Sequence, residues 1–293
     1  MTHIAAASPA LIKKESQVLE VFGRFKKNPL AVTGSVILIL LMLMAVAAPL
    51  IAPYDYTALD MAHMHEGPSQ EHWFGTDQLG RDVLSRIIYG SRYSLSLGIF
   101  AMLISNAIGI VFGALAGYFG GKADNIILRI IDIVQSIPGM LLAIVISTVL
   151  GSGYFNTVLA MSISSIPMVV RLLRASILRI RKEEYLEAAT LMNCSTGRII
   201  KKYIFPNSYS PLLVSATMGI GNTIMGASAL SYIGLGIQPP MAEWGAMLSG
   251  ARGYIRDFPH ELIFPGLFIM ITVLAFNLIG DGLRDALDPK LKN

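Results

Sequence analysis

Long apolar runs alternate with shorter polar connections along this chain of 293 residues. Because a helix rises about 1.5 Å per residue, a run of about 20 uncharged residues matches the hydrocarbon thickness of a bilayer. The pattern predicts an all-α, polytopic membrane protein with six transmembrane helices. Their expected ranges are 31–52, 93–119, 126–150, 154–170, 209–230 and 262–279.

Two of these spans carry signs of irregular backbone. Pro138-Gly139 should bend the third span. The uncharged stretch 208–241 is too long for one straight crossing, so the fifth span should be followed by irregular apolar backbone or a short helix.

Composition agrees with a membrane protein, since 54% of the residues are hydrophobic and only 14% are charged. A soluble domain carries about 25% charged residues. The net charge of +4 does not indicate a nucleic-acid partner, because the basic residues cluster at the ends of apolar runs. The expected partner of this surface is the lipid bilayer.

The distribution of Lys and Arg predicts the orientation of the chain. Of the 23 basic residues, 18 lie on the first, third, fifth and seventh flanks of the spans, when Arg129 is counted with the third. The positive-inside rule then places both termini in the cytoplasm. The expected organisation is a cytoplasmic segment 1–30 with an amphipathic helix over 15–27, a first span 31–53, an extracellular loop 54–92, a core 93–282 with a cytoplasmic loop 171–207, and a cytoplasmic tail 283–293.

Few polar residues interrupt the spans. Arg129 and Asp132 share a helix face and are expected to pair near the basic-side interface. Ser105, Gly109, Gly113 and Gly117 recur every fourth residue, which favours close packing of another helix.

The first external loop combines turn residues with charges. Asp82 and Arg86 are spaced for an i,i+4 pair on a helix that leads into the membrane. His63, His65 and His72 lie in the same loop. A His-x-His pair can bind a metal, but with no further ligand identified they are interpreted as solvated histidines.

A basic island between the fourth and fifth spans contains eight of the 23 Lys and Arg. Its centre predicts a short helix over 183–192, with Leu186, Ala189 and Met192 as an apolar stripe suited to a groove on a partner protein. Asn193 stands at the position where the helix should end, in a residue with left-handed backbone conformation.

Several chemistries lack support in the sequence. No P-loop string is present, so ATP is not bound by that route. Neither the HExxH nor the GxSxG string of two hydrolase classes occurs. We therefore expect no catalytic residue, metal or cofactor in this chain. A secondary transporter or channel is an alternative, although such proteins usually carry ionisable groups at mid-membrane.

Four strings together resemble one family. The string Glu187-Ala188-Ala189, followed by Pro206, resembles the EAA loop of permease subunits of bacterial ATP-binding-cassette importers. The strings HWFGTDQLGRD (72–82), GLGIQPPMAEWG (234–245) and GDGLRDALDP (280–289) resemble the C-type permease of the dipeptide, oligopeptide and nickel group. Asn193 departs from the Gly usual at that position, and the usual Ile-Leu-Pro reads Ile204-Phe205-Pro206.

This resemblance implies a type I importer fold and a set of partners. A B-type permease would complete the passage, two ATPase subunits would bind ATP and Mg, and an extracytoplasmic binding protein would deliver the cargo. It implies a bacterial inner or plasma membrane location. The implied cargo is a di- or oligopeptide, with nickel, a metal chelate or glutathione as alternatives.

Three groups of residues are candidates for these roles. The coupling loop to the ATPase subunits comprises Glu183, Glu184, Tyr185, Leu186, Glu187, Ala188, Ala189, Met192, Asn193 and Pro206. The candidates for lining the passage are Asn222, Thr223, Met218 and Met225. The candidates for contact with the binding protein are Asp77, Arg81, Asp82, Glu243 and Trp244.

Overall fold

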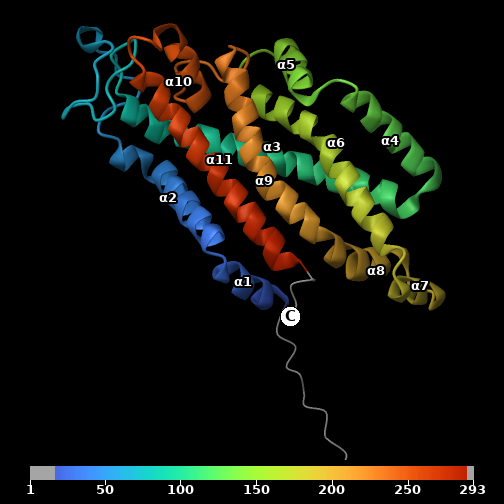
Figure 1. Ribbon diagram of the computed structural model, residues 1–293. Coiled ribbons are helices and arrows are strands. Elements are labelled where there is room, and N and C mark those ends of the chain that lie inside the picture. Colours follow the sequence, from blue (N-terminus) through green and yellow to red (C-terminus); the bar gives the residue numbers. More distant parts are fainter. Residues whose placement is uncertain (1–16, 289–293) are drawn as a thin grey trace, which may run out of the picture.

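The computed structural model describes residues 17–288, and helices dominate this part of the chain (Figure 1). Within it, five helical segments are long and apolar enough to cross a membrane. They are α2 (Pro29–Ile51), α3 (Val83–Phe119), α6 (Tyr154–Ile180), the run Thr196–Tyr232 that ends in α9 (Phe205–Tyr232), and α11 (His260–Leu287).

The third predicted span is broken. Helix α4 (Gly121–Gln135) and helix α5 (Gly139–Leu150) meet at an angle of 81°, and together they pass the test for one broken span. The expected bend at Pro138 is confirmed. It separates two helices because proline lacks a backbone N–H and disfavours helix in the preceding residue.

Three helices extend well beyond the predicted spans. Helix α3 begins at Val83 rather than at 93, so the predicted loop 54–92 ends at 82. Asp82 starts the helix because its carboxylate accepts a hydrogen bond from the backbone N–H of Ser85 at 2.7 Å. Helix α6 ends at Ile180 rather than at 170, and α11 ends at Leu287 rather than at 279.

The extension of α6 overturns the expected pair of Arg129 and Asp132. Asp132 on α4 instead accepts from Arg171 on α6 at 2.6 Å. One turn further along α6, Arg174 makes a two-pronged contact with Asp124, with Nε–Oδ1 and Nη2–Oδ2 distances of 2.5 and 2.7 Å. Sequence spacing along one helix could not reveal these partners, because they lie on two helices that meet only in the fold.

The stripe of small residues on α3 is confirmed as a packing face, since all four members are buried. A Cβ atom on Gly109 would lie 2.5 Å from Val169 of α6, and one on Gly117 would lie 2.9 Å from Ile177. Ser105 donates to the carbonyl of Ser162 at 2.9 Å. The close approach of α3 to α6 therefore depends on these small residues.

Short elements gather at the two ends of the bundle (Figure 1). Helices α1 (Gln17–Lys27), α7 (Glu184–Leu191) and α8 (Thr196–Ile199) lie at one end. Helix α10 (Trp244–Ala251) and the connection from α2 to α3 lie at the other. The remaining short elements are the 3₁₀ turns η1 (Met61–His63) and η3 (Arg252–Tyr254) and the π-helical turn η2 (Ile200–Ile204). The predicted amphipathic helix over 15–27 corresponds to α1, and its first two residues lie outside the described range.

The ion pair between Arg174 and Asp124 is expected to hold α4 on α6. In a double-mutant cycle, R174A and D124A should each destabilise the protein. The double variant should cost about 1 kcal/mol less than the sum, because one partner's removal already breaks the pair. Thermal unfolding in detergent measures this coupling, and strictly additive effects would contradict it. R129A, which removes a basic residue from α4 outside this ion pair, is the control.

Candidate functional site

Helix α7 forms the centre of the basic island and lies immediately after α6. Its sequence prediction over 183–192 is confirmed to within a residue at each end. Among its neighbours in sequence, Glu183 and Asn193 are exposed, as are Glu184, Tyr185, Glu187 and Ala188 within the helix. Pro206 lies in the first turn of α9, where its missing N–H is tolerated.

Only part of the expected apolar stripe on α7 is exposed to a partner. Leu186 is 5% exposed and Ala189 is 1% exposed, whereas Met192 is 71% exposed. Leu186 belongs to a buried cluster with Ile177 and Ile199 of this same chain. The prediction of a common partner-facing stripe was therefore wrong, because the buried half anchors α7 to the end of α6 and to α8.

The exposed face of α7 is the one available to another protein. It carries Glu184, Glu187, Ala188 and Leu191, which are spaced one turn apart. Leu191 was missed from sequence, although its spacing of three from Ala188 is the helical signal. A small residue flanked by carboxylates and an exposed leucine suits close approach to a groove with basic groups.

Asn193 ends α7 in the left-handed conformation, with φ of +56°. The N–H of Cys194 reaches back to the carbonyl of Ala189 at 3.1 Å, which is the wide bond of a Schellman motif. The expectation that Asn preserves the helix stop is therefore confirmed. Asn tolerates this conformation better than other residues with a Cβ atom.

Substitution of Asn193 tests this turn. N193V should cost about 1–2 kcal/mol, because a β-branched residue is strained at positive φ. N193G should be neutral or slightly stabilising, since glycine adopts this conformation freely. Unfolding midpoints of the two variants measure the difference, and equal loss in both would show that the side chain of Asn193, rather than its backbone conformation, matters.

The four passage candidates on α9 separate into two groups. Asn222 and Met225 are exposed on one face of the helix, and Met218 lies one turn earlier and is half-buried. Thr223 is buried in the chain's own core, so its prediction as a lining residue is not supported by its position. Asn222 presents an amide in a span, where contact with lipid is costly.

The candidates for binding-protein contact prove to be largely buried. Trp244 is fully buried, and its indole N–H donates to the carbonyl of Ile87 on α3 at 3.0 Å. Glu243 is also buried and caps α10 by accepting from the N–H of Ala246 at 2.8 Å. We assign these two residues to the junction of α3, α9 and α10 rather than to the outer surface.

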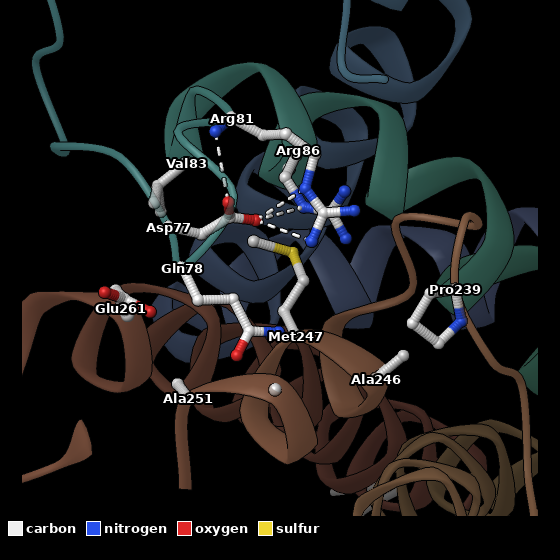
Figure 2. A pocket seen from close by; sticks show the side chains of 11 residues that line it. Asp77, Gln78, Arg81, Val83, Arg86, Pro239, Ala246, Met247, Ala251 and Glu261 are labelled. Atoms are coloured by element: carbon white, nitrogen blue, oxygen red, sulfur yellow. Dashed lines mark hydrogen bonds and ion pairs between the residues drawn. The ribbon is translucent and has the colours of Figure 1, made fainter. Parts of the chain in front are cut away.

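Of the remaining three candidates, Asp77 and Arg81 line a cavity of about 30 Å³ (Figure 2). The carboxylate of Asp77 accepts from Arg81 Nε at 2.8 Å and lies 3.4 Å from Arg86 Nε. Asp82 caps α3 instead of pairing with Arg86, which corrects the expected i,i+4 pair. This volume accommodates only one or two water molecules, so the cavity is not a site for cargo.

Two of the loop histidines are not the solvated residues that the sequence suggested. His65 Nδ1 lies 2.5 Å from Glu261 of α11, and its ring stacks on Phe258 with centroids 4.3 Å apart. His72 Nδ1 lies 2.9 Å from Asp82. His63 is more exposed and pairs with Asp60. Within the described residues no group of three or more metal-ligating side chains occurs, and the two buried pairs attach the loop to α3 and α11.

Burial raises the pKa of Glu243, which lies outside the membrane-spanning helices. Its carboxyl group is surrounded by hydroxyls of Ser94 and Ser228, at 3.4 and 3.3 Å. The carboxyl of Glu243 binds its proton more tightly in the folded state than in the unfolded state. Its protonated form therefore stabilises the fold, and this contribution is complete below the unfolded pKa. It is lost as pH rises towards the raised folded value.

E243Q should therefore flatten the dependence of stability on pH while keeping the cap on α10. E243A should lose the cap at every pH. Unfolding midpoints recorded between pH 5 and pH 9 test both statements. An unchanged pH profile in E243Q would show that another group is responsible.

Comparison with known proteins identifies the family of this chain. Residues 109–293 match the family described as binding-protein-dependent transport system inner membrane component. The chain belongs to this family. Residues 16–68 also match the N-terminal transmembrane domain of oligopeptide transport permease C.

Relatives of this permease cover nearly its whole length. The dipeptide transport system permease protein DppC of Alkalihalophilus pseudofirmus is 46% identical over 94% of the chain and 90% of its own length. The glutathione transport system permease protein GsiD of Pectobacterium atrosepticum is 47% identical over 94% of the chain and 91% of its own length. The chain is thus a permease subunit of an ATP-binding-cassette importer.

A solved structure supports the fold independently. An inward-facing form of the MetNI methionine transporter has a subunit that aligns with a TM-score of 0.59 at 19% identity. The alignment covers 70% of this chain and 98% of that one. At this identity the likeness concerns the fold alone, and it confirms the permease fold expected from the sequence.

Proposed function

We propose that this permease forms, with a B-type permease, the passage for short peptides in an ATP-driven importer. The observation that carries the proposal is α7, a short helix at one end of the bundle whose acidic and apolar outer face has no cover within the described chain. An extracytoplasmic binding protein delivers the peptide from the opposite end.

The energy for transport comes from partner subunits. The sequence contains no P-loop, so two ATPase subunits bind ATP and Mg and engage the outer face of α7. When the ATPase pair closes, α7 transmits the motion to α6 and α9, because its inner face is packed into the cluster that contains Ile177, Ile199 and Leu212.

The chain is oriented in the bacterial inner or plasma membrane with both termini in the cytoplasm. The excess of Lys and Arg on alternate flanks supports this orientation. The grouping of α1, α7 and α8 at one end of the bundle is compatible with it (Figure 1).

The passage runs along the face of α9 that carries Asn222 and Met225. These side chains point away from the chain's own core, and the second permease covers them from the other side. One amide among apolar side chains contacts a peptide loosely, so selectivity resides in the binding protein.

The two relatives support the choice of cargo. One is named for a dipeptide and the other for glutathione, which is itself a tripeptide, so short peptides are the class they share. Nickel or a metal chelate is the alternative within the same architecture.

Reconstitution tests the proposal. The chain is placed in liposomes with its B-type permease, the two ATPases and the binding protein encoded beside it, and uptake of labelled dipeptide, glutathione and nickel is compared. ATP-dependent peptide uptake is the expected result. Uptake of nickel but not of peptides would overturn the assignment of short peptides as the cargo. Uptake by the chain alone, driven by an ion gradient, would indicate a secondary transporter.

A further inference from the structure

Helix α1 turns two large apolar side chains away from the bundle. Leu19 is 64% exposed and Phe22 is 52% exposed, and they lie one turn apart on the same face. Phe25, one turn after Phe22, packs inward, and its ring lies 3.3 Å from the position of a Cβ atom on Gly282 of α11. The outward face is therefore an addition to the fold rather than part of its core.

This apolar face continues the lipid-facing surface of the first span. Only Asn28 separates α1 from α2, and its side chain accepts from the N–H groups of Leu30 and Ala31. Leu30 and, further along α2, Leu40 and Leu43 are exposed as well. Helix α1 thus lies where the hydrocarbon layer ends, with its apolar side available to the acyl boundary.

The charges of α1 suit the layer of lipid headgroups that borders the hydrocarbon. Helix α1 carries Arg24, Lys26 and Lys27 against a single acid, Glu20, which pairs with Arg24. The ammonium group of Lys26 lies 4.4 Å from the centroid of the Phe22 ring. A lysine above an aromatic ring places the ring in the apolar layer and the charge among the headgroups.

We infer that α1 is an interfacial helix that binds the headgroups of anionic phospholipids. Leu19 and Phe22 enter the acyl boundary, and Lys26 and Lys27 contact lipid phosphates. The helix has a direct connection to the bundle, because Asn28 Nδ2 donates to Asp285 of α11 at 3.2 Å. Lipid binding at α1 is independent of the cargo.

Fluorescence in the complete transporter tests the inference. In a C194S background, a single cysteine at position 22 carries an environment-sensitive dye, and a matched variant carries it at position 20, on the side of α1 opposite Phe22. The complex is reconstituted in nanodiscs of phosphatidylcholine with phosphatidylglycerol. Spin-labelled versions of either lipid are then added in equal amounts as quenchers.

The dye at position 22 should emit at shorter wavelength than the dye at position 20. It should be quenched more strongly by labelled phosphatidylglycerol than by labelled phosphatidylcholine. K26Q/K27Q should lower the preference for phosphatidylglycerol by roughly fivefold for each basic residue removed. The control K201Q/K202Q removes two charges elsewhere on the chain and should leave the preference intact.

Three results would overturn the inference. Equal quenching by both lipids would remove the anionic preference. Emission at 22 that matches the emission at 20 would place the helix in water. A blue-shifted dye at 22 that neither lipid quenches would show that a partner protein covers this face.

Discussion

E187R is expected to separate this permease from its ATPase subunits. Glu187 is exposed at the centre of the outer face of α7, and a reversed charge there would face the basic groups that we expect in the partner groove. Association should weaken by at least about 30-fold, which corresponds to roughly 2 kcal/mol, and uptake should fall with it. Co-purification of the ATPase subunits from membranes measures the effect.

The structure supplies sharp controls for this prediction. E71R reverses another exposed glutamate, in the connection between α2 and α3, and should leave the complex intact. A189L changes the buried face of α7, so it should destabilise the loop of the isolated chain, which E187R should not. If E187R co-purified with the ATPases and supported normal uptake, the outer face of α7 would not be the coupling surface.

W244A is expected to destabilise the whole end of the bundle that holds α10. Trp244 is fully buried, bonds to the Ile87 carbonyl, and lies against Gly90, where an added Cβ atom would be 3.0 Å from the indole ring. Removing a buried tryptophan side chain typically costs about 3–5 kcal/mol through the cavity that remains. Thermal unfolding and the yield of monodisperse protein in detergent measure this loss.

The other tryptophan is the matched control. Trp73 is 69% exposed, so W73A should change stability by less than about 0.5 kcal/mol. The pair also distinguishes structure from recognition. If W244A retained full stability but lost the response to the binding protein, Trp244 would be a contact residue after all, and its assignment to the junction would be wrong.

The coupling loop illustrates how far a periodic pattern leads. Spacing of apolar residues predicted the helix and its end at Asn193, because both are set by local geometry and by backbone conformation. It could not predict that Leu186 and Ala189 face inward, since an apolar stripe is equally suited to a partner and to the chain's own core. That choice depends on where α6 and α8 lie, and only the fold brings Ile177 and Ile199 to the helix.

The loops at the α10 end of the bundle show the same limit for polar residues. A charged or aromatic residue in an exposed loop is ordinarily a candidate for recognition, yet Glu243 and Trp244 are buried at the start of α10. His65 finds Glu261 nearly two hundred positions away in the chain, a partner that no local spacing indicates. Such residues are buried because the ends of three helices converge there.

By itself, the sequence determined what the membrane and local backbone chemistry require. These are the apolar runs long enough to cross a membrane, the bend at Pro138, the small-residue face of α3 and the short helix of the basic island. The tertiary structure decided where helices end beyond the apolar runs and which charges pair, as for Arg174 with Asp124. It also decided which face of each helix remains free for a partner. The physical reason is that apolar length and proline act locally, whereas burial and ion pairing depend on residues that meet only when the helices pack.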